Sequence, residues 1–196
     1  MGEPEDFPLW REWVWYAHLA SDGDYCANYC KVCNFSTIRS FWQLWNNVLP
    51  VERIFFGDEY GVAQNKTVMG YSIFQEGIVP EWEDPRNREG SELCYRATLT
   101  AEELERVWRE LTLLLIGYDE CSALVYGIRL VSKPYRGVRN NFKVEIWLSD
   151  ALQQTTSAVH GMLREHVPDL ALQKATHVLH AESSTMDRQR TRRSRQ

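Results

Sequence analysis

Residues 100–117, "TAEELERVWRELTLLLIG", decide the fold class, because they predict one long amphipathic helix between two strand-like segments. Thr100 and Glu103 have the spacing of a capping box at a helix start, and Gly117 is typical of a helix end. The apolar side chains between them recur every three or four residues, at Leu104, Val107, Trp108, Leu111 and Leu115. Such a stripe predicts a helix that packs one face against a hydrophobic core.

Two similar patterns predict helices over residues 36–48, where Ser36 and Thr37 are candidate caps, and over 150–167, beginning at Asp150. Short runs rich in β-branched and aromatic residues predict strands at 12–19, 24–32, 70–75, 92–99, 122–131, 141–149 and 176–181. Helices separated by pairs of strands, without a regular βαβ alternation, favour an α+β fold with a mostly antiparallel sheet. The helices would cover one face of that sheet and leave the other face open for a site.

The chain has 196 residues, enough for a single domain with a substantial core, which we place at residues 7–180. No apolar run is long enough to cross a membrane, and the acidic N-terminus lacks the apolar segment of a secretory signal. We expect residues 1–6 to be flexible. Residues 181–196 end in "DRQRTRRSRQ", with five Arg and one Asp, and are predicted to form a disordered Arg-rich tail.

The rest of the chain is acidic. The whole sequence has a net charge of −5 and its last ten residues have +4, which leaves −9 for residues 1–186. This balance argues against a broad surface for duplex nucleic acid, which needs many cations facing phosphates. Contacts to nucleic acid would therefore be few and local.

Five cysteines, an odd number, without a secretion signal predict reduced thiols and a cytosolic or nuclear protein. Cys26, Cys30 and Cys33 are spaced closely enough to suggest zinc, but no second ligand pair with the usual spacing accompanies them. The sequence therefore predicts no metal and no cofactor.

The stretch "GIVPEWEDPRNREG", residues 77–90, is too rich in Pro and Gly for a regular helix and places Trp82 between acidic residues. Glu81, Glu83 and Asp84 could supply a general acid and base for glycoside cleavage, but neighbours along a chain rarely converge on one bond. In a recognition loop, the indole would stack on a base and a carboxylate would accept hydrogen bonds from the donor edge of guanine. The third interpretation is a structural anchor at Trp82 with a solvated Glu83.

The string "GIVPEWED" resembles the cap-binding loop of the translation initiation factor 4E family, which holds the 7-methylguanosine cap of messenger RNA. In order and spacing, "PLWREWVWY", "FSTIRSFWQLWNNV", "VWRELTLLLIG" and "YGIRLV…FKVEIWLS" are similar to the opening segment, the first two helices and the basic hairpin of that family. The resemblance covers roughly residues 7–165. It implies a curved antiparallel sheet, backed on its convex face by three helices, with the cap slot on the concave face.

By position, the resemblance implies that Trp82 stacks on the methylated base and that Glu83 grips the guanine edge. The second stacking aromatic falls on Tyr25, where the family usually has Trp, and Tyr29 competes for this place if the loop is gapped. Trp147 matches the residue that approaches the N7-methyl group.

The phosphate-binding positions match less completely. The resemblance implies that Arg129 and Lys143 are two of the three basic residues that hold the phosphates. The third position falls on Glu92, an acid where a cation is expected, so that either Arg86 or Arg88 compensates or the triphosphate is held less tightly.

On the predicted helix at 36–48, Ile38 and Trp42 share one stripe, Phe41 and Trp45 share another, and one of the two packs onto the sheet. The resemblance implies that Ile38 and Trp42 are exposed and bind a helix of initiation factor 4G or of a competing 4E-binding protein. The other partner-binding positions that it implies are Pro8, Glu110 and Leu113.

These expectations describe a cytoplasmic or nuclear protein that is not an enzyme, binds capped mRNA and recruits a 4G-type scaffold for translation initiation. A cap-binding repressor or specialised relative is the alternative, because Glu92 departs from the family pattern and Arg109 stands where the family usually has an apolar residue. An insertion within residues 130–142 carries basic side chains and Tyr135. It either contacts modified first nucleotides of the transcript or forms a solvated hairpin tip.

Overall fold

The computed structural model describes residues 6–20, 29–57, 62–63, 66–132 and 141–181. Its strands are β1 (Pro8–Leu19), β2 (Tyr29–Thr37), β3 (Val62–Ala63), β4 (Lys66–Gln75), β5 (Ser91–Thr98), β6 (Val125–Ser132), β7 (Asn141–Leu148) and β8 (Ala175–Leu179). They form a sheet in the order β2-β1-β4-β6-β7-β5-β8, with β3 beside β4, and every strand pairing among the described residues is antiparallel. The predicted α+β class with an antiparallel sheet is confirmed.

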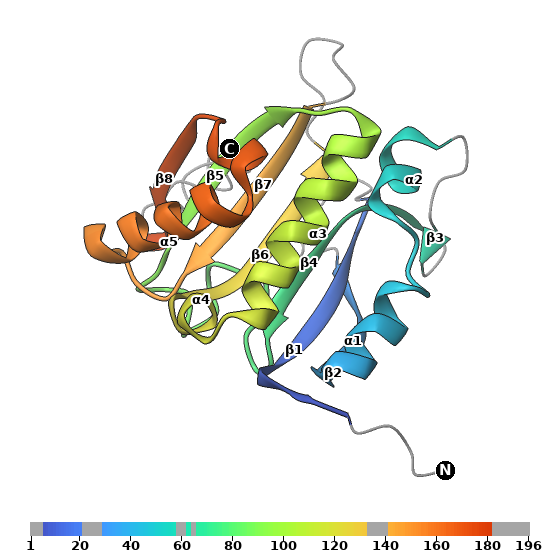
Figure 1. The fold of residues 1–196 in the computed structure, drawn as a ribbon, viewed down its shortest axis with the longest axis horizontal. Helices are drawn as coiled ribbons and strands as arrows, with labels where there is room; N and C mark the ends of the chain where they lie inside the picture. The colour runs from blue at the N-terminus through green and yellow to red at the C-terminus, as the bar shows by residue number, and fades with distance from the viewer. Residues whose placement is uncertain (1–5, 21–28, 58–61, 64–65, 133–140, 182–196) are drawn as a thin grey trace, which may run out of the picture.

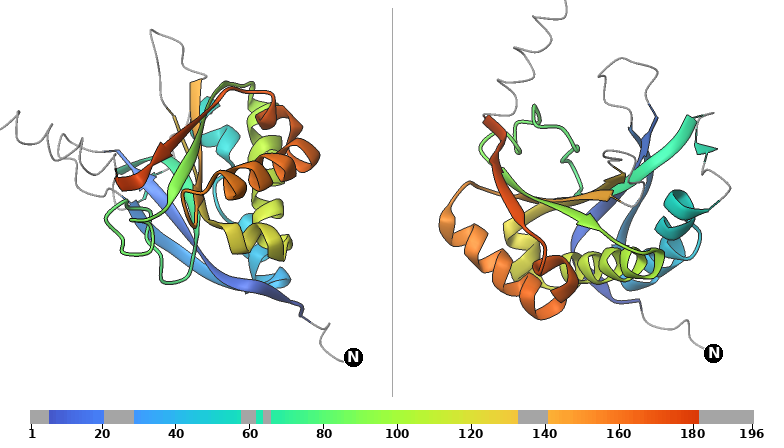
Figure 2. Two further views of the ribbon diagram at one scale, coloured as in Figure 1. Left: turned by 90° about the vertical axis from the view of Figure 1, so that its left-hand side faces the viewer. Right: turned by 90° about the horizontal axis from the view of Figure 1, so that it is seen from above.

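The helices are α1 (Ile38–Trp45), α2 (Val51–Phe56), α3 (Ala101–Gly117), α4 (Asp119–Leu124), α5 (Gln153–His166) and α6 (Pro168–Ala171). Figure 1 shows α3 and α5 lying across the sheet, and Figure 2 shows the helices together on the convex side of the curved sheet. The loop of residues 76–90 lies on the opposite, concave side (Figure 2, right). Among the described residues, no helix has the length and apolar character needed to cross a membrane.

Side chains of the sheet divide between two clusters because neighbours along a strand point to opposite faces. On β1, Trp13 and Trp15 belong to the main core between the sheet and the helices. Trp15 meets Trp108 of α3 there, edge to face, with ring centroids 6.0 Å apart. Val14 and Tyr16 belong to a second, smaller cluster on the concave face.

The helix starts largely follow the sequence signals. Thr37 caps α1, and Thr100 and Glu103 form the predicted capping box of α3, which ends at Gly117 as expected. The third long helix begins at Gln153 rather than at Asp150, so that expected start is wrong. The Asp150 carboxylate instead accepts hydrogen bonds from the Leu152 N–H at 2.9 Å and from Thr155 Oγ1 at 3.0 Å, which places it ahead of the helix.

Two predicted strands differ from the structure. The start of the strand expected at 122–131 is wrong, because Ser122 lies in α4, where Gln75 Nε2 donates to its carbonyl oxygen at 2.6 Å. The strand expected at 24–32 lies partly outside the described residues, and β2 continues to Thr37. Because β2 is an edge strand in which Phe35 alone is fully buried, its sequence shows little apolar alternation.

Candidate functional site

The loop of residues 76–90 is held in shape by two of its own polar side chains. Asp84 Oδ2 accepts a hydrogen bond from the backbone N–H of Val79 at 3.0 Å. Asn87 is fully buried, and its Nδ2 donates to the carbonyl oxygens of Val79 at 2.9 Å and Glu81 at 2.8 Å. These bonds give the loop a defined shape without a ligand, which reduces the ordering cost of binding.

The three acidic residues around Trp82 have different surroundings. Glu81 Oε1 accepts a hydrogen bond from the Tyr29 hydroxyl at 2.9 Å, and Asp84 binds backbone N–H groups. Glu83 is exposed, and its carboxylate has no hydrogen-bond or ion-pair partner among the described residues. The three acids therefore do not form an acid–base pair, and Glu83 is the one available to accept hydrogen bonds from a ligand.

Trp82 is half-buried against the small cluster on the concave face. The fully buried members of that cluster are Val14, Tyr16, Phe74, Ile78 and Trp147. The indole Nε1 is buried without a hydrogen-bond partner among the described residues. Trp82 is thus anchored in part by packing, while the rest of its side chain stays accessible beside Glu83.

Of the two candidates for a second stacking aromatic, Tyr25 lies outside the described residues. Tyr29 begins β2 and packs its ring edge to face on Tyr16, with centroids 5.3 Å apart. Burial and the hydrogen bond to Glu81 raise the pKa of the Tyr29 hydroxyl well above its usual value, so the phenol stays protonated and donates. Tyr29 therefore supports the loop of residues 76–90 through its hydrogen bond to Glu81.

A compact group of four charged side chains lies on the concave face of β5, β6 and β7. We call Glu92, Arg129, Lys143 and Glu145 the charged cluster. A terminal nitrogen of the Arg129 guanidinium donates to Glu145 Oε1 at 2.8 Å. Arg129 Nε lies 2.5 Å from Glu145 Oε2, as an ion pair. Lys143 Nζ contacts Glu145 Oε1 and lies 3.3 Å from Glu92 Oε1. Two positive and two negative side chains leave the charged cluster with no net charge.

The carboxylates of the charged cluster are among the most buried groups of the molecule. Glu145 is 0% exposed and Glu92 is 2% exposed. Burial alone would raise the pKa of Glu145, but Arg129 and Lys143 lower it to about 2. Burial, followed by the neighbouring Glu145, raises the pKa of Glu92 despite the attraction of Lys143. Glu145 is therefore firmly ionised, and Glu92 is the more easily protonated of the two.

His180, just after β8, connects the charged cluster to the loop. Its Nδ1 lies 2.7 Å from the Asn87 carbonyl oxygen, and its Nε2 lies 4.0 Å from Glu92 Oε2. Burial lowers the pKa of His180, which favours the neutral ring. A neutral imidazole that donates from Nδ1 to the Asn87 carbonyl presents an unprotonated Nε2 to Glu92.

Trp147 is 1% exposed and forms the centre of the concave face. Its Nε1 donates to Glu145 Oε2 at 3.1 Å. The Arg129 guanidinium lies 5.7 Å from its ring centroid, and the His180 ring lies 4.6 Å away. The structure thus brings Trp147, Arg129 and Lys143 together, and it adds two residues that sequence reasoning missed. The period-two alternation of "KVEIW" would have placed Glu145 on the same face as Lys143 and Trp147, whereas His180 carries no local signal.

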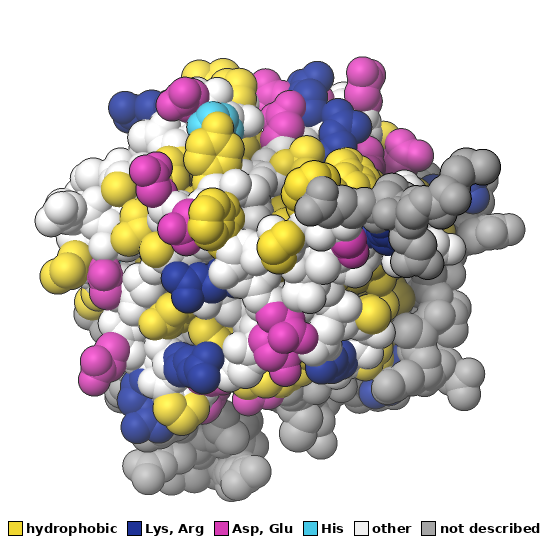
Figure 3. All heavy atoms as spheres, turned by 60° about the horizontal axis from the view of Figure 1, so that its bottom comes forward, with side chains coloured by type: hydrophobic (Ala, Val, Ile, Leu, Met, Phe, Trp, Pro, Cys, Tyr) yellow, Lys and Arg dark blue, Asp and Glu magenta, His cyan; other side chains and the backbone are white. Residues whose placement is uncertain are grey.

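The partner-binding residues expected from the sequence lie on the other side of the molecule. On α1, Ile38 is 45% exposed and Trp42 is 38% exposed, while Phe41 between them is buried. Leu113 of α3 is 37% exposed, and Pro8 is also exposed, whereas Glu110 is partly buried. Figure 3 shows hydrophobic side chains in several groups on the part of the surface that it presents, with acidic and basic side chains between them.

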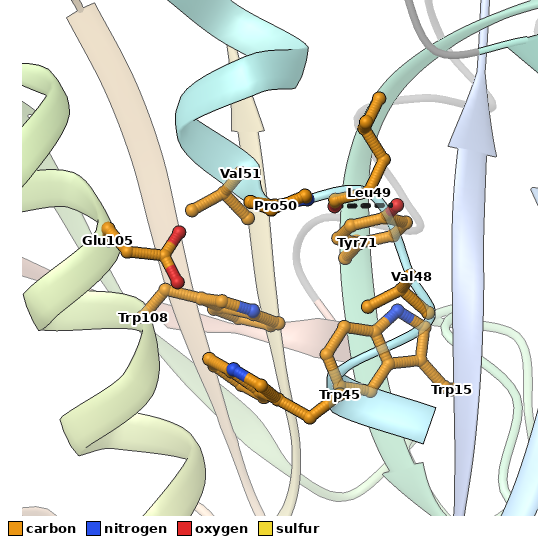
Figure 4. A pocket seen from close by; sticks show the side chains of 9 residues that line it. All are labelled: Trp15, Trp45, Val48, Leu49, Pro50, Val51, Tyr71, Glu105 and Trp108. Atoms are coloured by element: carbon orange, nitrogen blue, oxygen red, sulfur yellow. Dashed lines mark hydrogen bonds between the residues drawn. The ribbon is translucent and has the colours of Figure 1, made fainter. Parts of the chain in front are cut away.

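A small hollow opens between the end of α1, the start of α2 and the first half of α3 (Figure 4). Its lining includes the aromatic rings of Trp15, Trp45 and Trp108, with Glu105 at its edge. The indole Nε1 atoms of Trp15 and Trp108 have no hydrogen-bond partner among the described residues. The cavity volume is about 20 Å³, which suits a single water molecule and is far too small for a nucleotide.

The fold is an α+β fold in which helices cover the convex face of a curved antiparallel sheet and the loop of residues 76–90 lies on the concave side. A family model described as "Eukaryotic initiation factor 4E" matches residues 8–196. The chain therefore belongs to the eukaryotic initiation factor 4E family.

Several relatives are similar in sequence. Translation initiation factor 4E of Aplysia californica is 29% identical over 165 residues, which cover 81% of this chain and 69% of that protein. The human factor is 27% identical over 158 residues, covering 76% and 65%, and the mouse type 1B factor is 29% identical over 149 residues, covering 74% and 54%. The chain spans about half to two thirds of the length of these relatives.

Solved structures confirm the fold. Caenorhabditis elegans eIF4E-3, in complex with the 4E-binding protein Mextli, has a TM-score of 0.74 at 22% identity, over 92% of this chain and 97% of that chain. Ascaris suum eIF4E-3, in complex with an m2,2,7G cap, has a TM-score of 0.70 at 23% identity, over 90% and 92%. Schistosome eIF4E, with m7GpppA and 4E-BP, has a TM-score of 0.69 at 23% identity, over 91% of each chain.

Proposed function

We propose that the concave face binds the 7-methylguanosine cap of messenger RNA and that the chain acts as a binding protein rather than an enzyme. The observation that carries the proposal is a half-buried Trp82 beside Glu83, whose carboxylate has no partner in the part of the chain that the structure describes, on a loop braced by its own hydrogen bonds. A base made cationic by methylation would stack on the indole. The Glu83 carboxylate would accept hydrogen bonds from the N1–H and N2–H groups of guanine.

Other residues would have secondary parts in this site. Tyr25 is the proposed second stacking aromatic, because the hydroxyl of Tyr29 is already bound to Glu81. Arg129 and Lys143 would line the path of the phosphates. Trp147 would approach the N7-methyl group only if the ligand displaces part of the packing that covers its ring, because Trp147 is 1% exposed.

The relatives support this proposal. Ascaris suum eIF4E-3 has been solved with m7G and m2,2,7G caps, and schistosome eIF4E with m7GpppA. We place the cap-binding domain at residues 7–180 and the protein in the cytoplasm, the compartment of translation.

Replacing Trp82 by alanine tests the proposal. Stacking of one base on an aromatic ring is worth about 1–3 kcal/mol, so Trp82→Ala should weaken binding of 7-methyl-GTP by about one to two decades. Isothermal titration calorimetry measures this change directly, with unmethylated GTP as the second ligand. Trp10→Ala is the matched control, because Trp10 is exposed at the start of β1 and belongs to neither cluster. A folded Trp82→Ala protein that binds 7-methyl-GTP as tightly as the wild type contradicts the proposal.

We propose a second function for the opposite side of the molecule, the recruitment of a 4G-type scaffold for translation initiation. The proposed contact residues are Pro8, Ile38, Trp42, Glu110 and Leu113. The exposure of Ile38 and Trp42 above a buried Phe41 supports this proposal, because a helical partner needs an apolar stripe. C. elegans and schistosome relatives have been solved with 4E-binding proteins.

The alternative is a cap-binding repressor or specialised relative that does not support general initiation. It is favoured by Arg109, an exposed cation on α3 next to Glu110, which would select a partner with a different charge pattern. Addition of the purified protein to a translation extract depleted of its own 4E factor separates the two. Restored translation supports the general factor, and further inhibition supports the repressor.

A further inference from the structure

The two cations that face the proposed phosphate path are already paired with buried carboxylates. Glu145 is held by both nitrogens that Arg129 presents to it and by Lys143. Lys143 also contacts Glu92. The Trp147 ring that packs against Arg129 belongs to the same apolar cluster as Trp82. The charged cluster therefore adjoins the proposed base-binding loop.

The pairing occupies part of the donor set of the two cations and compensates their charge. A guanidinium has five N–H donors and an ammonium has three. Arg129 donates one hydrogen bond to Glu145 from a terminal nitrogen, and its Nε lies 2.5 Å from the other carboxylate oxygen as an ion-pair contact. Lys143 directs one donor to Glu145 and one to Glu92. The remaining donors of Arg129 and Lys143 could contact a phosphate oxygen, but the positive charge of both side chains is already compensated by Glu92 and Glu145.

Both carboxylates of the charged cluster are enclosed by protein. Glu145 is fully buried, and its second oxygen also accepts the Trp147 N–H. Glu92 is 2% exposed and lies between Lys143 and the His180 ring. A phosphate that took Lys143 away from Glu92 would leave a buried carboxylate without its cation, which is a costly arrangement. The same phosphate would also be repelled by that carboxylate.

We infer that this chain selects its ligand by the methylated base and not by the phosphate chain, and that Glu92 and Glu145 are the residues that set this specificity. The inference rests on the proposed cap-binding function and specifies the class of ligand, methylguanine nucleotides irrespective of the number of phosphates. Methylguanine nucleotides with one phosphate bind nearly as well as those with three. Arg129 and Lys143 act mainly in positioning Trp147 and the sheet, through Glu145.

The test compares 7-methyl-GMP with 7-methyl-GTP by isothermal titration calorimetry on the full chain. A charge-assisted hydrogen bond raises affinity by roughly ten- to a hundredfold. Because the cations are compensated, we expect the wild-type affinities for the two nucleotides to differ by less than about tenfold. Glu92→Gln keeps the shape of the side chain and removes one negative charge from the charged cluster. It should raise the preference for the triphosphate by about tenfold.

Glu89→Gln is the matched control, because Glu89 is an exposed acid on the loop outside the charged cluster, and its loss changes the net charge of the protein equally. A wild-type preference of a hundredfold or more for 7-methyl-GTP overturns the inference and would mean that other cations, such as the exposed Arg96, hold the phosphates. The inference is also overturned if Glu92→Gln and Glu89→Gln show the same preference for 7-methyl-GTP over 7-methyl-GMP. If neither nucleotide binds to the wild type, the proposed function itself fails, and the inference fails with it.

Discussion

Asn87 allows a sharp test of how the loop of residues 76–90 is held. Its side chain donates two hydrogen bonds to the carbonyl oxygens of Val79 and Glu81, at 2.9 and 2.8 Å, from a fully buried position. In Asn87→Ala both carbonyl groups lose their donor. At about 1 kcal/mol per hydrogen bond, the closed loop should lose about 2 kcal/mol relative to an open form. This free energy corresponds to an increase of about 30-fold in the opening equilibrium.

Amide hydrogen exchange followed by NMR measures this opening. The N–H groups of Val79 and Gly90 report on the loop, because they donate to Asp84 Oδ2 at 3.0 Å and to the Asn87 carbonyl at 2.9 Å. Their exchange should accelerate by about 30-fold in Asn87→Ala if the loop opens as a unit. Arg88→Ala is the control, since Arg88 is exposed on the same loop. Unchanged exchange at Val79 and Gly90 in the Asn87 variant would refute the bracing role.

Two further predictions concern other parts of the molecule. Trp42→Ala should weaken binding of a helical 4E-binding peptide by at least about 30-fold, as expected for an interface hot spot, and leave 7-methyl-GTP binding unchanged. Leu152→Ala is the control, because Leu152 is an exposed leucine ahead of α5. Unaltered peptide affinity in the Trp42 variant would argue against this surface. Burial lowers the pKa of His18 to about 3 from 6.5, so between these values the unfolded chain binds a proton that the folded chain does not. The free energy of unfolding should therefore fall as pH drops below about 6.5, by about 2 kcal/mol of His18 origin at pH 5. Urea unfolding at pH 7.5 and 5 should show this loss in the wild type, and a His18→Gln protein with the same pH dependence would disprove the assignment.

The long helices could be predicted because their signals are local. The capping box at Thr100 and the apolar stripe of α3 lie within the helix itself. α4 was missed because Ser122 and its neighbours resemble a strand, and contacts from Gln75, distant in sequence, help to hold the turn that they form. Similarly, edge strand β2 shows little alternation because few of its side chains are buried.

The candidate site likewise has features that could be predicted from the sequence and features that depend on the folded structure. The neighbouring aromatic and acid in a loop rich in Pro and Gly drew attention to Trp82 and Glu83, and the resemblance of "GIVPEWED" to the cap-binding loop of the 4E family led to their choice as site residues. The different surroundings of Glu81 and Asp84 could not be predicted, because they depend on Tyr29 and on the backbone of a folded loop. The neutral charge of the region around Arg129 also needs the structure, since strand pairing brings Glu145 opposite that residue.

The contact between His180 and Asn87 has a consequence for synthesis of the chain. β8 is the last described strand and pairs at the sheet edge with β5, which directly follows the loop of residues 76–90. During translation, residues 76–90 leave the ribosome long before His180 and so lack one of their hydrogen-bonding partners. A nascent chain can thus assemble most of its sheet while the loop is still incompletely held. If residues 76–90 form the proposed binding site, that site would be fully held only after β8 has docked and His180 has reached the Asn87 carbonyl oxygen.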